Sequence, residues 1–285
     1  MIRKVILSAD STCDLSSDLK EKYNVHYYPF HIILGDRQYQ DNVDITPDEI
    51  YQEYEEKKIL PKTAAIGAGE YIEHFKDWVN QGYDVIHLNL GSAISAAYQN
   101  CCLAAEQLGH VYPIDSCNLS TGIGLLVIEA AKLIAQGMDA PQIQAKIKAM
   151  VEKSHASFIL DTLKFMHAGG RCSAVTALGA NLLRLKPCIE VDNRDHGSMG
   201  VGKKYRGDLD KVLVQYVTDK LKDRDDLRLD RIFITHAGIS QRRVALVEET
   251  VRALQPFREI HVTRASCTIS SHCGPNTLGV LFLTK

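Results

Sequence analysis

The stretch from Asp84 to Glu106 constrains the fold most, because it changes from a strand pattern to a helix pattern within a few residues. Val85–Leu90 is apolar and predicts a strand that enters a core. Residues 96–107 are rich in Ala, Leu and Gln and contain neither Pro nor Gly, which predicts a helix. A strand followed directly by a helix is the repeating unit of a parallel α/β sheet. The sequence therefore predicts an α/β protein.

The segment Gly91–Ser95 joins this strand to this helix and carries two hydroxyl side chains, Ser92 and Ser95. In parallel α/β sheets, the loops at the carboxyl ends of the strands form ligand sites. Unpaired backbone N–H groups at the start of the helix, together with the helix dipole, favour an anion at this position. Ser92 and Ser95 are therefore the first candidate binding residues.

The order of the predicted elements indicates two domains. Up to about residue 155, strands and helices alternate as expected for a parallel sheet with helices on both faces. Beyond that point the pattern changes: a small-residue helix is predicted over 175–185, and two further helices alternate with strands. We predict an N-terminal domain over residues 1–155 and a C-terminal α/β domain over residues 156–285. Within the first domain, Pro29 predicts a change of pairing inside the apolar run 25–34.

Charge and composition argue against several classes of protein. The formal net charge is −2, which gives no electrostatic footprint for nucleic acid. No apolar run approaches the ~18 residues of a membrane span, and the first residues do not resemble a signal peptide. We therefore expect a cytoplasmic protein. The eight cysteines include no Cys-x-x-Cys pair, so we expect reduced thiols, no metal site and no cofactor.

Nucleotide and hydrolase signatures are weak. Gly122-Ile-Gly124 lacks the third glycine of a dinucleotide fingerprint, and the chain has no Gly-Lys-Ser/Thr phosphate loop. Ser92 is not flanked by the glycines of a Gly-x-Ser-x-Gly elbow. Asp10, Ser92 or Ser95, and His272 could form a catalytic triad, but no spacing requires it. A serine hydrolase acting on a small acyl ester therefore stays an alternative to a binding protein without catalytic residues.

Hydroxyl side chains recur at the predicted ends of strands. Each could simply cap a helix, but together they predict a neutral hydrogen-bonding cup for a carboxylate or phosphate. Arg171, which follows two glycines, and His272, which precedes Cys273 and Gly274, are the cationic candidates near it. A structural role for His272 is the alternative. The hydroxyl residues are Ser11, Thr12, Thr63, Ser92, Ser95, Ser116 and Ser120.

Eight short motifs occur in order over nearly the whole chain. They are Asp10–Leu15, Pro61–Thr63, Gly91–Gln99, Asp115–Gly124, Gly169–Arg171, Lys186–Pro187, Lys204–Gly207 and His272–Pro275. The first resembles the Asp-Ser-Thr-x-Asp-Leu opening of the DegV family, and the third resembles its Ser-Ser-x-Leu-Ser-Gly-Thr-Tyr-Gln segment. No motif is specific by itself, but the ordered series resembles that family strongly. Ala64-Ala65 stands where the family has Ser-Gln, and Ala96-Ala97 stands where it has Gly-Thr, so both departures remove polar groups.

The resemblance implies a two-domain α/β protein that holds one long-chain (C14–C18) fatty acid in a tunnel between its domains. It implies that Thr63, Ser92 and Ser95 bind the carboxylate, and that Arg171 and His272 support them. It further implies that the bound acid is presented to a fatty-acid kinase subunit for acyl-phosphate formation in phospholipid synthesis, with Arg206 at the docking surface and only transient membrane contact.

The residues agree with an acyl-binding protein independently of the resemblance. A tunnel needs many aliphatic side chains, and the apolar runs Leu125–Ile134 and Val280–Leu283 are candidates to line it. Burial of an acyl chain contributes roughly 0.8 kcal/mol per CH₂. Hydroxyl donors and one cation would then fix the head group at the rim.

Overall fold

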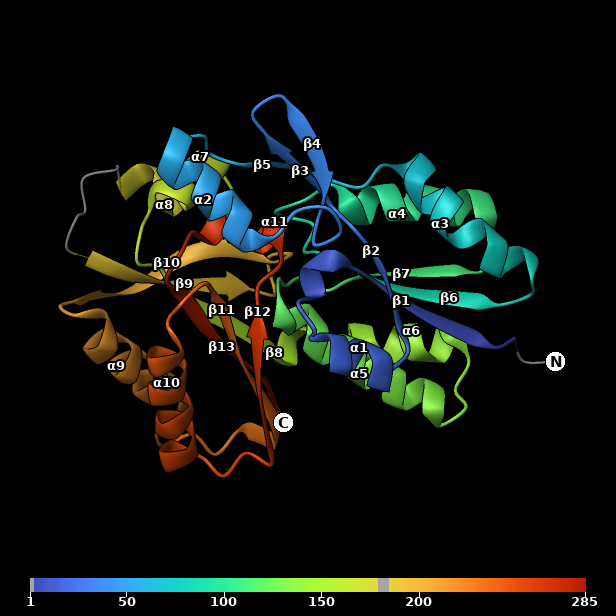
Figure 1. Cartoon of the computed structure of the whole chain (residues 1–285). Coiled ribbons are helices and arrows are strands. Elements are labelled where there is room, and N and C mark those ends of the chain that lie inside the picture. Colours follow the sequence, from blue (N-terminus) through green and yellow to red (C-terminus); the bar gives the residue numbers. More distant parts are fainter. Residues whose placement is uncertain (1–2, 179–184) are drawn as a thin grey trace.

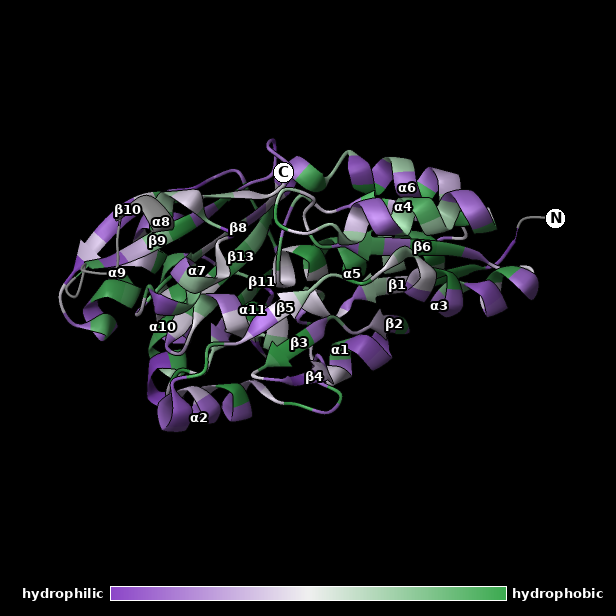
Figure 2. Cartoon of the chain, turned by 90° about the horizontal axis from the view of Figure 1, so that it is seen from above, coloured by the Kyte–Doolittle hydropathy of each residue, from purple (hydrophilic) through white to green (hydrophobic). Residues whose placement is uncertain are grey.

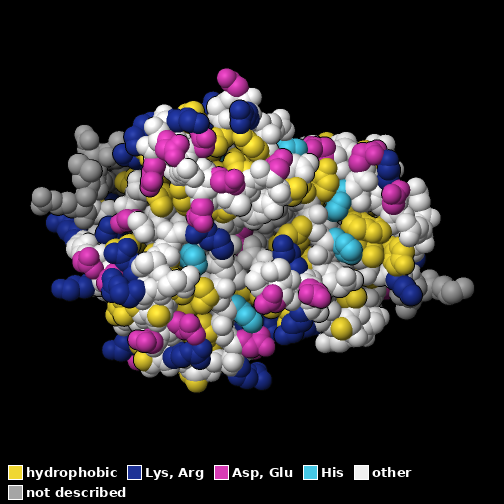
Figure 3. Space-filling model, viewed as in Figure 1, with side chains coloured by type: hydrophobic (Ala, Val, Ile, Leu, Met, Phe, Trp, Pro, Cys, Tyr) yellow, Lys and Arg dark blue, Asp and Glu magenta, His cyan; other side chains and the backbone are white. Residues whose placement is uncertain are grey.

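The computed structural model describes residues 3–178 and 185–285. It contains two large sheets side by side, each with its own helices, and a small three-stranded sheet above the junction between them (Figure 1). None of the helices in the described part of the chain is both long and apolar enough to cross a membrane. On the face in Figure 3, cationic and anionic side chains are intermixed.

The first large sheet is wholly parallel and has the strand order β2-β1-β6-β7. In Figure 1, α3 and α4 cover one face of it, and α1, α5 and α6 cover the other. This confirms the predicted parallel α/β unit. Its strands are β1 (Val5–Asp10), β2 (Val25–Tyr28), β6 (Asp84–Asn89) and β7 (Val111–Asp115). Its helices are α1 (Ser17–Lys22), α3 (Ala68–Asn80), α4 (Ala97–Leu108), α5 (Thr121–Ala135) and α6 (Ala140–Lys148).

Pro29 separates two strands that belong to different sheets, as predicted. β2 pairs with β1, whereas β3 (His31–Leu34) pairs antiparallel with β4 (Arg37–Gln40) and β5 (Lys62–Ala64). The connecting helix α2 (Pro47–Lys57) begins at a reciprocal cap, in which Thr46 and Glu49 bond each other's backbone N–H. This small sheet and α2 place β5 directly beside the C-terminal half of the chain.

The second large sheet is mixed, with the strand order β10-β9-β8-β13-β11-β12. Only β11 and β12 pair in parallel, and the other neighbours are antiparallel. Its strands are β8 (Ser154–Ile159), β9 (Leu185–Asp192), β10 (Ser198–Arg206), β11 (Leu227–Ala237), β12 (Glu259–Arg264) and β13 (Thr277–Thr284). Its helices are α7 (Lys164–Gly169), α8 (Ser173–Leu178), α9 (Leu209–Leu221), α10 (Gln241–Leu254) and α11 (Cys267–Cys273). The two-domain α/β layout is thus present, with the change of sheet at β8.

The largest hydrophobic core extends across both sheets, and apolar residues concentrate on the strands and on α5 (Figure 2). This corrects one expectation. None of residues 125–134 lines the main cavity or the inner cavity described below, because α5 packs its apolar side chains against the sheets. Of Val280–Leu283, Leu281 lines the inner cavity described below. The helix predicted over 175–185 agrees with α8 at residues 175–178, whereas Leu185 begins the strand β9. Residues 179–184 lie outside the described residues.

Candidate ligand-binding site

A cavity of about 220 Å³ lies between the first sheet, the small sheet and the second sheet. Four of its wall residues are polar ones predicted from the sequence: Thr63, Ser95, Arg171 and His272. Most of the remaining wall is apolar and includes Phe30, Ala64, Ala65, Leu90, Ile94, Ala96, Leu119, Met166, Met199, Ile269 and Cys273. An apolar pocket with a few convergent polar groups is the usual form of a small-molecule site.

A smaller inner cavity of about 20 Å³ continues behind the first. The two share Leu119, Ile269 and Cys273 as wall residues. The inner wall adds Phe158 and Leu281, which come from β8 and β13. The apolar space therefore extends inward, toward the second sheet.

Thr63 and His272 form the polar centre of the main cavity. Thr63 Oγ1 of β5 lies 2.9 Å from His272 Nε2 of α11. Burial, and secondarily the charge of Arg171, lowers the pKa of His272 to about 4, so the imidazole is neutral near pH 7. His272 Nδ1 is buried without a hydrogen-bond partner in the described part of the chain. A bare acceptor is tolerated better than an orphaned N–H. We therefore assign the proton to Nε2, which leaves the Thr63 hydroxyl free to donate to a ligand.

The His272 ring is held in place by close packing against α7. A Cβ atom built on Gly169 would lie only 2.1 Å from His272 Nδ1. Only glycine permits this approach of the α7 backbone to the ring. The glycines of the Gly169-Gly170-Arg171 motif therefore have a packing role as well as the turn role assigned from the sequence.

Ser95 lies at the start of α4. Its side chain combines the two roles considered from the sequence, which are helix capping and a place in the wall of the ligand site. Its Oγ accepts a hydrogen bond from the Ala97 backbone N–H (3.1 Å), as a helix cap does. The residue also lines the main cavity. Since Oγ acts as an acceptor in the cap, the hydroxyl proton of Ser95 remains available to a ligand.

Ser92 is not brought to this cavity. Its Oγ donates to Asp115 Oδ2 (2.5 Å), and its backbone N–H donates to Asp115 Oδ1 (3.2 Å). Ser92 instead lines a separate surface hollow with Tyr98 and His196. The structure thus gives Ser92 a role in shaping the loop, at a position apart from the other four predicted side chains.

The two predicted arginines differ in position. Arg171 follows α7 at the cavity wall, is exposed, and donates from Nη1 to the Gly169 carbonyl oxygen (2.6 Å). Arg206 is the last residue of the edge strand β10, is also exposed, and is not part of the cavity wall.

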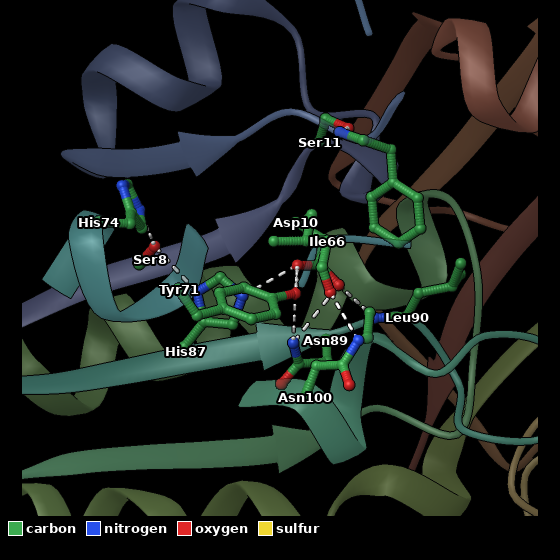
Figure 4. A network of polar contacts seen from close by, with 12 residues as sticks. Ser8, Asp10, Ser11, Ile66, Tyr71, His74, His87, Asn89, Leu90 and Asn100 are labelled. Atoms are coloured by element: carbon green, nitrogen blue, oxygen red, sulfur yellow. Dashed lines mark hydrogen bonds and ion pairs between the residues drawn. The ribbon is translucent and has the colours of Figure 1, made fainter. Parts of the chain in front are cut away.

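The loop that carries Ser95 is anchored by the fully buried carboxylate of Asp10, at the end of β1 (Figure 4). Asp10 accepts hydrogen bonds from Tyr71 Oη (2.6 Å), the Leu90 N–H (2.9 Å) and His87 Nε2 (3.0 Å). Asp10 therefore pairs with His87 and not with His272, which corrects its place in the triad considered above. It holds the backbone immediately before Gly91.

Sequence reasoning did not identify His87, Tyr71 or the apolar wall residues Phe30, Met166 and Met199. His87 could have been found, because Ser8 and His87 are both polar residues within apolar strand segments. The two residues are directly paired on neighbouring parallel strands, and His87 Nδ1 lies 2.9 Å from Ser8 Oγ. The methionines carried no such signal, because they lie on α7 and β10, far apart in the chain.

One group among the described residues could hold a metal ion. Candidate ligand atoms of Asp115, Cys117 and His196 lie within 4.8 Å of one another. The Asp115 carboxylate already accepts hydrogen bonds from the backbone N–H of Ser92 and of Cys117 (2.9 Å for the latter) and from the Ser92 hydroxyl. The structure accounts for this cluster through those hydrogen bonds.

Asp14 ties the first sheet to the second behind the cavity. It accepts hydrogen bonds from Ser120 Oγ (2.5 Å) and from the Ser266 N–H (2.9 Å). Burial, which outweighs these hydrogen bonds, raises the pKa of Asp14 to about 7. In the folded protein the Asp14 carboxyl group therefore keeps its proton at pH values where the same group in the unfolded chain has already lost it.

Stability should consequently fall as the pH rises from about 4 to about 7, and the loss should then level off. An asparagine side chain is neutral at every pH and keeps the shape of protonated Asp14. We expect the unfolding free energy of Asp14→Asn, minus that of the wild type, to increase by about 2–3 kcal/mol when the pH is raised from 5 to 8. Urea unfolding across this range measures the difference. Exposed Asp36→Asn is the control, and a gain no larger than in that variant would contradict the assignment.

Comparison with known proteins agrees with this architecture. Residues 4–285 match the family model described as "Uncharacterised protein, DegV family". A DegV domain-containing protein from Clostridium perfringens is 34% identical over 206 residues, which cover 72% of this chain and 73% of that protein. Another from Clostridium acetobutylicum is 27% identical over 286 residues, with 100% of both chains covered.

A solved structure shares the whole fold. It is that of a DegV family protein from Thermus thermophilus, described as binding fatty acid. It is 25% identical, covers 99% of this chain and 100% of its own, and superposes with a TM-score of 0.87. The order of strands, the cavity between the sheets and the match over residues 4–285 lead to one conclusion: this chain belongs to the DegV family.

Proposed function

We propose that this protein binds one long-chain fatty acid, of about 14 to 18 carbons, with its carboxylate at Thr63 and Ser95 and its chain in the apolar cavity. The observation that carries this proposal is the neutral Thr63–His272 pair, 2.9 Å apart, at one side of a largely apolar cavity. The Thermus thermophilus relative, described as a fatty-acid binder, supports it.

The head group would be held mainly by hydroxyl donors. In the assigned tautomer, His272 donates to Thr63, and the Thr63 hydroxyl then donates to the carboxylate. Ser95 supplies a second O–H donor from the start of α4. Exposed Arg171 supplies the opposite charge, which solvent weakens. Since His272 is neutral, this arrangement keeps its polarity over the whole physiological pH range.

The acyl chain would be accommodated by adaptable side chains. The main cavity, at about 220 Å³, is smaller than the roughly 300–1,000 Å³ usual for ligand pockets. Met166 and Met199 line it, and the unbranched methionine side chain changes shape easily. A long chain would also move Leu119 and Ile269 aside to enter the inner cavity. Each buried CH₂ contributes roughly 0.8 kcal/mol, which can offset this rearrangement.

We further propose that the bound acid is presented to a separate fatty-acid kinase subunit for acyl-phosphate formation. Exposed Arg206 is the proposed docking residue, and exposed Lys203 and Lys204 on the same edge strand support a basic docking surface. Arg206→Glu should abolish acyl-phosphate formation by an added kinase subunit while fatty-acid retention is unchanged. Parallel loss of retention would contradict a docking role.

The geometry favours a carrier over a hydrolase. Within the described part of the chain, His272 Nε2 has Thr63 as its partner, and no carboxylate bonds His272 Nδ1. Ser92 donates to Asp115, and Ser95 accepts from the Ala97 N–H. Within the described residues, neither serine is hydrogen-bonded to a histidine that could act as its general base.

The deciding measurement is mass spectrometry of an organic extract of the purified protein, followed by fatty-acid titration of variants. We expect about one C14–C18 acid per chain. Thr63→Val and Ser95→Ala should each weaken binding roughly tenfold, because each removes a donor to a charged group. Thr250→Val on α10 is the matched control, since its hydroxyl bonds only the helix backbone (Leu246 O, 2.7 Å).

Two results would contradict the proposal. The first is an empty extract combined with no rise in melting temperature on addition of palmitate or oleate. The second is release of nitrophenol from a short ester that Ser95→Ala abolishes, which would favour the hydrolase.

A further inference from the structure

A further hollow lies at the other end of β11 from the ligand cavity. Its volume is about 600 Å³, and it lies where the start of β11 meets α5 and β12. The opposite end of β11, at His236 and Ala237, lines the inner ligand cavity. We call this second site the basic hollow, because five cationic residues line it: Lys132, Arg228, Arg231, Arg258 and Lys285.

An irregularity in the sheet lies at the wall of the hollow. Leu227 pairs with Thr284 of β13, whereas Ile232 pairs with Phe282, so β11 advances five residues while β13 advances two. Residues 228–231 therefore leave the β11–β13 ladder, whereas Arg231 stays paired with Glu259 of β12. Bulges re-aim side chains and are over-represented next to functional sites. Arg231 is the last residue of this irregular segment and the most deeply buried cation of the hollow.

Arg231 is buried without a full set of hydrogen bonds. Its side chain is only 5% exposed, and neither Nε nor Nη1 has a hydrogen-bond partner in the described part of the chain. Two carboxylates lie nearby but beyond hydrogen-bonding contact: Glu259 at 3.5 Å from Nη2, and Glu129 at 3.8 Å from Nη1. Buried donors that remain unpaired are costly and call for an explanation such as a bound ligand.

The surrounding acids do not neutralise the basic hollow. Glu129 lies 2.7 Å from Lys132 and 3.2 Å from Arg228, so both of these cations share it. Asp230 also binds Arg228, at 2.9 Å. In contrast, exposed Arg258 has no ion pair among the described residues, and Lys285 Nζ donates only to the Asp225 backbone oxygen (2.5 Å). Five cations thus face three carboxylates, which leaves an excess of positive charge.

We propose that the basic hollow binds a phosphate group, either as free phosphate or as a phosphate monoester. On phosphate binding, the Arg231 guanidinium would turn toward the hollow and offer the Nε and Nη1 donors that lack a hydrogen bond within the described residues. Arg258 and Lys285 supply further charge at the rim. Because Lys132 comes from α5 and Arg231 from β11, a bound phosphate would join the two halves of the molecule. This site is separate from the carboxylate cavity and does not depend on fatty-acid binding.

The test is a calorimetric titration of the protein with inorganic phosphate and, separately, with glycerol phosphate, both at constant ionic strength. Sodium chloride is the reference for screening by salt. Arg258→Gln and Lys285→Gln should each raise the dissociation constant about fivefold or more, since each removes a charged donor at the rim. Lys211→Gln on α9 is the matched control, because it removes an exposed charge far from the hollow.

The comparison of the two ligands shows which phosphate compound the hollow prefers. Tighter binding of glycerol phosphate indicates a phosphate monoester, and tighter binding of inorganic phosphate indicates the free ion. The proposal is overturned if phosphate acts no differently from chloride. It is also overturned if both rim variants match Lys211→Gln. Arg231→Lys keeps the charge but not the fork and should also weaken binding, with its fold checked by circular dichroism.

Discussion

Asp10→Ala should lower the free energy of unfolding by about 3–5 kcal/mol, the range for breaking a buried charged network. The Asp10 carboxylate is fully buried and accepts hydrogen bonds from Tyr71, His87 and the Leu90 N–H. Alanine would leave all three buried donors without this acceptor. Urea unfolding measures the effect.

Asp36→Ala provides the control for this prediction, because Asp36 is an exposed turn residue. We expect that variant to stay within about 0.5 kcal/mol of the wild type. Asp10→Asn should fall between the two, since its amide keeps one acceptor oxygen. A loss below about 1 kcal/mol for Asp10→Ala would show that the network does not anchor the loop before Ser95.

Gly169→Ala should disrupt the candidate site through packing alone. The added Cβ would lie 2.1 Å from His272 Nδ1, so either the ring or α7 must move. Overpacking of this kind typically costs about 1–3 kcal/mol. Displacement of His272 would also break its 2.9 Å contact with Thr63, and we expect fatty-acid affinity to fall by about tenfold or more.

Gly200→Ala is the matched control for Gly169→Ala, because no atom lies within 4 Å of the Cβ that it would add. Melting temperature and fatty-acid titration should be measured on both variants. Nuclear magnetic resonance of the His272 ring adds a readout that a general loss of stability would not change. An unchanged ring signal together with unchanged affinity would show that α7 adjusts and that Gly169 does not position the histidine.

Local patterns in the sequence were sufficient to predict most of the elements. The strand and helix on either side of Gly91–Ser95 appear as β6 and α4, and the break at Pro29 appears as a change of sheet. The reciprocal cap of Thr46 and Glu49 at the start of α2 is likewise formed by residues close together in the chain. These features depend on side-chain periodicity and on backbone chemistry within a few residues, which a sequence states directly.

The candidate site was only partly accessible to the same reasoning. Thr63, Ser95, Arg171 and His272 line one cavity. Hydroxyls at the predicted strand ends indicated such a cup, but no spacing in the sequence required these four side chains to meet. Ser92 carries the same hydroxyl as Ser95 in the same loop, yet its side chain turns to Asp115. The two serine side chains point in different directions because each hydrogen-bonds a different partner in the folded protein.

The sequence by itself determined the α/β class, the parallel first sheet and the hydroxyl-rich loops at strand ends, because periodicity and capping act over short distances. Only the tertiary structure decided that Asp10 pairs with His87 and that α5 fills the core instead of lining the cavity. The tertiary structure alone also revealed the unpaired donors of Arg231 beside a β-bulge. These outcomes depend on which distant side chains share a buried space, and burial sets both the cost of an unpaired group and the packing that avoids it.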